Sequence, residues 1–187
     1  MSYIQNYFHG VKSLMDHVPE ELVEELTTAM EDVWKRSGRT ILMGNGGSSS
    51  SASHIVNDLQ KCIFTESGKP LKALCLTDNV PLIVAWGNDT EFANIFAPQV
   101  ECWAEPGDLV IGISGSGNSE NVIRGIQKAN EKKAMTFGLA GYGGGRLAEV
   151  AQKCIVLDSR NMQQIEDMHL IILHLVFSAL RERVRKA

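Results

Sequence analysis

The sequence predicts an α/β fold, in which a doubly wound parallel sheet is accompanied by helices at the N- and C-terminal ends of the chain. Two observations lead to this class. Short apolar runs of strand length alternate with segments of helical periodicity along the whole chain. Two loops rich in glycine and serine each follow such a run and precede a helical segment, in keeping with this alternation. The length suits one domain, with N-terminal helices over residues 1–36 and an α/β core with a terminal helix over residues 37–187.

The apolar runs and periodic segments place each element in turn. Strands are predicted over residues 40–43, 73–76, 109–113, 135–139 and 154–157. Helices are predicted over residues 3–15, 18–34, 48–60, 80–86, 91–102, 120–131, 147–152 and 163–183. Residues 87–89, with the sequence Gly-Asn-Asp, are predicted to form a polar turn, and residues 141–145 a glycine-rich loop.

The composition argues against several classes of protein. The formal net charge is -4 and the basic residues are scattered, which disfavours a nucleic-acid partner. The N-terminus lacks a basic region and no apolar run reaches ~20 residues, so we expect neither a signal peptide nor a membrane partner. No CxxC pair is present, so free thiols in a reducing cytoplasm are expected for Cys62, Cys75, Cys102 and Cys154.

Two loops, residues 44–51 and 114–119, carry the chemistry that a phosphate group requires. Each lies between a predicted strand and a predicted helix, whose N-terminus favours an anion. Their glycines allow a close approach of the backbone, and their serine hydroxyls donate hydrogen bonds. Turn formation and helix capping, with Ser119 as the N-cap, explain one such loop equally well. Two such loops favour a phosphorylated ligand.

Other phosphate-binding motifs do not fit. The motif GxxxxGK[ST] is absent, which excludes a Walker site. No loop spells GxGxxG with an acidic residue at the end of the following strand, which disfavours a dinucleotide site.

Carboxylates and histidines occur together on two predicted helices. His54 and Asp58 are four residues apart and share one face of a helix. Glu166 and His174 lie about two turns apart on the terminal helix. His169, on the same helix, points elsewhere. A carboxylate and an imidazole are a natural pair for general acid–base catalysis. From spacing alone, the commoner explanation is that the acids are solvated and that His174 is a core or interface residue.

Two segments resemble the signature segments of the SIS (sugar isomerase) family, in its phosphoheptose isomerase branch. They are GNGGS at residues 44–48, followed by a helix with His54, and GISGSGNS at residues 112–119. The Gly-Asn-Asp segment, the pair Thr77 and Asp78, and two histidines on the terminal helix also fit that branch. The resemblance covers essentially the whole chain. It implies a single SIS domain with flavodoxin-like layering.

The same resemblance implies a function and an assembly. The implied protein is a cytoplasmic aldose–ketose isomerase that converts sedoheptulose 7-phosphate to glycero-manno-heptose 7-phosphate. The implied assembly is a homotetramer that is packed through the N- and C-terminal helices and shares its sites between subunits.

Roles for individual residues follow from the resemblance as well. Asp58 takes the position of the catalytic base, and His174 that of a second acid–base group. The implied substrate contacts are Asn45, Gly46, Ser48, Asp89, Ser114, Ser116, Ser119 and Glu166. Several members bind zinc through the corresponding groups, which here are His54, Asp58, Glu166 and His174. Capping of a turn is the alternative explanation for Asp89, as for Thr77 and Asp78.

Four positions depart from the pattern of that branch. Asp58 replaces a glutamate and Glu166 replaces a neutral glutamine, whereas Cys62 stands in place of an arginine and Asn57 in place of a second acid. Proton transfer depends on geometry at the ~1 Å scale. We therefore expect an isomerase or epimerase that acts on a heptose phosphate or a related sugar phosphate.

The alternative is a non-catalytic SIS-domain protein, which either senses a sugar phosphate or binds a replication initiator. Carboxylates and histidines at all four implied positions argue against the initiator-binding type, which has lost them.

Overall fold

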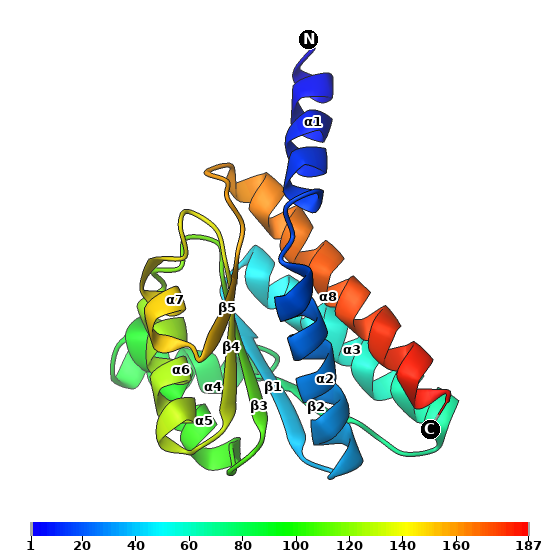
Figure 1. Ribbon diagram of the computed structural model, residues 1–187. Helices are drawn as coiled ribbons and strands as arrows, with labels where there is room; N and C mark the ends of the chain where they lie inside the picture. Colours follow the sequence, from blue (N-terminus) through cyan, green and yellow to red (C-terminus); the bar gives the residue numbers. More distant parts are fainter. Residues whose placement is uncertain (1, 187) are drawn as a thin grey trace.

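Residues 2–186, which the computed structural model describes, form a five-stranded parallel sheet between two layers of helices (Figure 1). The strands are β1 (Arg39–Gly44), β2 (Lys72–Cys75), β3 (Leu109–Ser114), β4 (Met135–Ala140) and β5 (Lys153–Val156). Their order across the sheet is β2-β1-β3-β4-β5, and each neighbouring pair is parallel. The predicted α/β class with a doubly wound parallel sheet is confirmed.

Helices cover both faces of the sheet. One layer contains α2 (Glu20–Lys35), α3 (Gly47–Ser67) and α8 (Met162–Val184). The other layer contains α4 (Val80–Asp89), the short 3-10 helix η1 (Phe92–Asn94), α5 (Ala97–Trp103), α6 (Glu120–Glu131) and α7 (Gly145–Val150). Among the described residues, no helix is both long and apolar enough to cross a membrane.

The strands are apolar on both sides because each side meets a layer of helices. In β1, Leu42 packs in the cluster formed with α2, α3 and α8, whereas Ile41 and Met43 pack in the cluster on the opposite face. All three side chains are fully buried. Burial on both faces therefore accounts for the continuous apolar runs that predict the strands.

Two segments differ in kind from the prediction. The prediction of a polar turn over residues 87–89 is wrong, because these residues end the helix α4. Thr90 ends this helix, and its hydroxyl donates a hydrogen bond to the Trp86 carbonyl (2.7 Å). The single helix predicted over residues 91–102 is divided into η1 and α5, since Pro98 near the start of α5 has no N–H to donate to a preceding turn.

Helix α1 (Tyr3–Met15) projects from the body of the molecule near the N-terminal end of α8 (Figure 1). Polar contacts hold it there: Tyr7 donates a hydrogen bond to Asp167, and Gln164 donates one to the Tyr7 carbonyl (3.0 Å). Much of its apolar surface remains uncovered. The exposed fractions are 81%, 65% and 68% for Tyr3, Ile4 and Phe8.

Candidate active site

The two loops identified in the sequence meet at one edge of the sheet. β1 and β3 are neighbours, and Gly44 at the end of β1 pairs with Ile113 of β3. From this edge the chain enters α3 on one face after β1, and α6 on the other face after β3. Such diverging connections open a crevice at the carboxyl ends of the strands, where doubly wound folds bind their ligands.

In residues 44–48, here called the glycine loop, two glycines shape the site. Gly46 precedes α3 and has a φ of +51°, in the left-handed region that glycine adopts without strain. Gly47 begins α3, and a Cβ atom there would lie 2.7 Å from Oε2 of Glu166 on α8. The Glu166 carboxylate therefore lies against the first turn of α3, where the helix dipole favours its negative charge. Ser48, in the same turn, is buried.

Residues 114–119, here called the serine loop, are ordered by hydrogen bonds of their own. Ser114 ends β3 and is buried, and its hydroxyl donates to the Ser119 hydroxyl (3.0 Å). The Asn118 N–H donates to the Ser116 hydroxyl (3.2 Å). Ser119 occupies the N-cap position of α6, but its side chain makes no capping hydrogen bond. Helix capping therefore does not account for this hydroxyl.

Asn121, which carries no distinguishing signal in the sequence, joins the two loops. Its side chain and that of Asn45 exchange two amide hydrogen bonds, of 2.9 and 2.8 Å, across 76 positions of the chain. Asn45 is thus linked to the first turn of α6, directly after the serine loop. Local periodicity cannot identify a partner at this separation.

Packing of α3 against α8 brings three of the predicted site residues together. The Nε2 atoms of His54 and His174 are 2.9 Å apart. Asp58 Oδ2 lies 3.6 Å from the first of these atoms and 3.9 Å from the second. One ligand atom from each residue lies within 4.8 Å of the others. The three side chains are partly exposed, so a small molecule can reach them.

Comparison with known proteins is consistent with this arrangement. The family model described as the SIS domain matches residues 6–141. The phosphoheptose isomerase of Aquifex aeolicus is 38% identical over 159 residues, which cover 85% of this chain and 81% of the relative. That of Geotalea daltonii is 33% identical over 184 residues, which cover 97% and 95%. This chain belongs to the phosphoheptose isomerase family of SIS-domain proteins.

Solved structures show the same fold. The phosphoheptose isomerase from Francisella tularensis has a TM-score of 0.89 at 26% identity, with 96% of this chain and 95% of that chain covered. The enzyme from Neisseria gonorrhoeae has a TM-score of 0.86 at 25% identity, with 95% and 94% covered. The sugar isomerase domain of an RpiR transcription factor from Sphaerobacter thermophilus shares the fold alone, with a TM-score of 0.60 at 16% identity.

In this member of the family, Asn57 orients the carboxylate of Asp58. The Asn57 amide donates a hydrogen bond to Asp58 Oδ1 (3.3 Å), whereas Oδ2 faces His54 and His174. Asn57 and His54 also line a polar cleft of about 530 Å³. The other residues of the cleft are Ser49, Ser50, Ser53, Thr77 and Asp78.

Asp89 does not line this polar cleft. It is the last residue of α4, and not part of the polar turn that the sequence predicts for residues 87–89. Its carboxylate accepts a hydrogen bond from the Asn88 side chain (2.9 Å). It lines a separate cavity together with Leu82, Ala85 and Trp86.

His169 lies inside the protein, whereas His54 and His174 are partly exposed. Its side chain is 1% exposed, and burial lowers its pKa to about 4 against a smaller opposing effect of the Ala140 backbone. The imidazole is therefore neutral at pH 7. The four cysteines are free thiols, as predicted, and burial raises the pKa of Cys154 to about 11.

Proposed function

We propose that this chain is an aldose–ketose isomerase that converts sedoheptulose 7-phosphate to glycero-manno-heptose 7-phosphate, or acts on a closely related sugar phosphate. The observation that carries the proposal is the group of His54, Asp58 and His174 on helices that pack together beside the glycine loop. The names of the relatives in its family support the reaction class.

The reaction transfers one proton between two carbons and one between two oxygens. Asp58 removes the proton from C1 of the ketose, and His174 protonates O2, so that an enediol forms. Asp58 then returns a proton to C2 while His174 accepts the proton that O1 loses as the aldehyde forms. The distance of 3.9 Å between Asp58 Oδ2 and His174 Nε2 supports this assignment, because one bound substrate can meet both groups.

The two loops are the proposed phosphate site. Its donors are the backbone at Asn45 and Gly46 and the hydroxyls of Ser48, Ser114, Ser116 and Ser119. The N-termini of α3 and α6 add unpaired N–H groups and a favourable dipole. The absence of a capping bond from the Ser119 hydroxyl supports this role. Glu166, beside Gly47, and Asp89, at the end of α4, are the proposed contacts for the sugar hydroxyls.

Zinc is the proposed cofactor. His54, Asp58 and His174 offer two imidazoles and a carboxylate within 4.8 Å of one another, a donor set that suits this ion. Glu166, on the same helix as His174, is the proposed fourth ligand, although in this chain its carboxylate lies against Gly47 and outside the group of three. When bound, the ion would orient and polarise the substrate oxygens.

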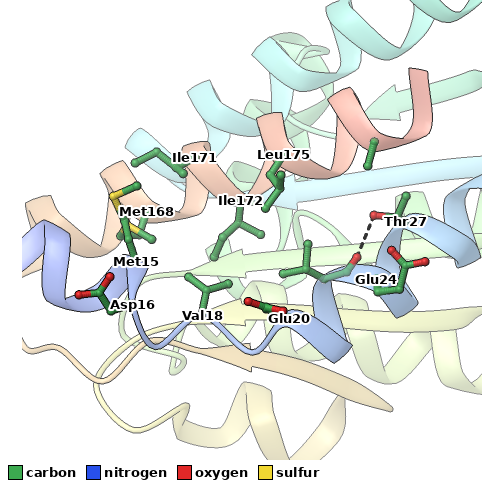
Figure 2. Close-up of a pocket in the computed structure, with 12 residues that line it drawn as sticks. Met15, Asp16, Val18, Glu20, Glu24, Thr27, Met168, Ile171, Ile172 and Leu175 are labelled. Carbon is green, nitrogen blue, oxygen red and sulfur yellow. Dashed lines mark hydrogen bonds between the residues drawn. The ribbon is translucent and has the colours of Figure 1, made fainter. Parts of the chain in front are cut away.

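A homotetramer is the proposed assembly, with further copies of this chain as partners. Figure 2 shows a mostly apolar groove between the start of α2 and one side of α8, which is also lined by Asp16, Glu20 and Glu24. The volume of this groove is about 350 Å³. Its apolar lining includes Met15, Val18, Val23, Met168, Ile171 and Leu175. The projecting helix α1 offers exposed apolar side chains on the same chain, as a self-complementary interface requires. The free thiols support the proposed cytoplasmic location.

Proton NMR of sedoheptulose 7-phosphate in D₂O tests the reaction, with the protein first chelated and then supplied with zinc. We expect solvent deuterium to enter C1 and an aldose anomeric signal to appear. Binding of the sugar phosphate without exchange in either metal state would contradict the isomerase and favour a sensor. No binding at all would also contradict the phosphate site and favour a role in binding another protein.

A further inference from the structure

The side chains of Asn45 and Asn121 link the glycine loop to the helix that follows the serine loop. Asn45 Nδ2 donates to Asn121 Oδ1 at 2.9 Å, and Asn121 Nδ2 donates to Asn45 Oδ1 at 2.8 Å. Asn121 Oδ1 also accepts the backbone N–H of Val122 (2.9 Å). Because the two bonds run in opposite directions, neither amide can rotate by half a turn without losing both.

Burial strengthens this link. Asn121 is only 2% exposed, so water is not available to replace a lost partner. A buried amide group that loses its hydrogen bond has a large desolvation cost. The pair therefore holds Asn45 in one orientation and ties the end of β1 to the first turn of α6.

The glycine loop needs such a link because its own sequence does not define its conformation. Glycine loses more backbone freedom on ordering than any other residue, and residues 44–48 contain three of them. A loop that becomes ordered only when ligand arrives weakens binding by that entropy. A loop that is already held against its neighbour avoids this loss.

We infer that Asn121 is a positioning residue, which fixes the glycine loop against the serine loop so that the donors of both face one phosphate group. The inference rests on the proposed function and deepens it. Asn121 does not contact the substrate in this scheme and acts through Asn45.

Steady-state kinetics with sedoheptulose 7-phosphate compare two asparagines of the same helix. Asn130 is the matched control, since its side chain donates to the Val150 carbonyl (2.7 Å) and accepts from the Thr136 hydroxyl (2.8 Å) at the far end of α6. Asn121→Ala is expected to raise KM about tenfold, the effect of losing about one net hydrogen bond, with a smaller change in kcat. Asn130→Ala is expected to lower the melting temperature but to leave KM within about twofold.

Hydrogen exchange measures the loop without any reaction. In the ligand-free protein, Asn121→Ala is expected to speed the exchange of backbone amides in residues 44–48, and Asn130→Ala is not. Asn45→Ala breaks the same pair from its more exposed side, and is the variant to use if Asn121→Ala does not fold. In that case Asn45→Ala is expected to accelerate the exchange of backbone amides in residues 119–122.

The outcomes separate this inference from the proposed function. Equal KM values and equal exchange in the Asn121→Ala and Asn130→Ala proteins would overturn the positioning role. The wild-type protein could also fail to convert sedoheptulose 7-phosphate while exchange of the glycine loop is faster in Asn121→Ala. That combination would reject the proposed function and support the positioning role.

Discussion

His54 and His174, which are 120 positions apart in the chain, face each other with their Nε2 atoms 2.9 Å apart. Their rings are inclined by 76°, and Asp58 Oδ2 lies within 3.9 Å of both nitrogens. Two imidazole nitrogens at this distance share either one proton, which one donates to the other, or one cation. The site is therefore suited to proton transfer and to metal binding, and the two uses lead to separate predictions.

Zinc binding is expected to depend on both histidines. His54→Ala and His174→Ala each remove one of three converging ligands, so zinc affinity in calorimetric titration should fall at least tenfold, or about 1.4 kcal/mol. The control is His17→Ala, because His17 bonds to the Ser13 carbonyl on another helix and lies outside this group. Wild-type affinity in both site variants would contradict the proposed ligands.

Removal of the carboxylate charge at Asp58 is expected to stop catalysis while the ligand still binds. Asp58→Asn keeps the size of the side chain but cannot accept a proton, so kcat should fall about 10²- to 10⁴-fold, whereas affinity for the sugar phosphate changes little. Asp32→Asn, at an exposed position of α2, is the control and should leave kcat unchanged. Loss of sugar-phosphate binding in Asp58→Asn would assign Asp58 to substrate binding instead of base catalysis.

The contact between Gly47 and Glu166 predicts an unusual effect of alanine. A glycine-to-alanine change inside a helix usually stabilises a protein by up to about 1 kcal/mol. Here the new Cβ would lie 2.7 Å from the carboxylate at the flexible end of Glu166, which must move aside at a small cost, so Gly47→Ala is expected to stabilise by less than this amount in urea unfolding. In a Glu166→Ala background the cost should disappear. Equal effects in the two backgrounds would show that the contact is not the cause.

His169 predicts how stability depends on pH. Its pKa is about 4 in the folded protein and about 6.5 in an unfolded chain, so the unfolded state binds the proton more readily. Above pH 6.5 His169 is neutral in both states, and its burial does not lower the free energy of unfolding. As the pH falls toward 4, the unfolded chain takes up the proton first, so the free energy of unfolding falls by up to about 3 kcal/mol. Urea unfolding of His169→Leu should show a shallower loss over this interval than the wild type. An unchanged pH dependence would contradict this assignment.

The apolar groove of Figure 2 predicts the effect of a charge on assembly. Leu175 lines the groove and is 51% exposed, so Leu175→Glu is expected to convert tetramers to smaller species in sedimentation velocity. Val84→Glu is the matched control, because Val84 is an exposed apolar residue of α4 in the opposite layer. A wild-type monomer, or a tetramer in both variants, would contradict the proposed interface.

Prediction from the sequence succeeded where the determining contacts are local. His54 and Asp58 share one face of α3 because they are four residues apart, and the helix that follows the serine loop has its predicted bounds. It failed at residues 87–89, since Gly, Asn and Asp favour turns but are also tolerated at the end of a helix that Thr90 closes. Glu166 lies against Gly47, outside the group formed by His54, Asp58 and His174, and no spacing rule describes that contact.

The sequence by itself determined the alternation of strands and helices, the two loops at strand ends and the shared helix face of His54 and Asp58. These features depend on the periodicity of side chains and on residues a few positions apart. Only the tertiary structure decided that β1 and β3 are neighbours, that His174 meets His54, and that Asn121 meets Asn45. Such contacts depend on strand order and on the packing of α3 against α8, which are determined by the burial of whole apolar faces and not by any local pattern.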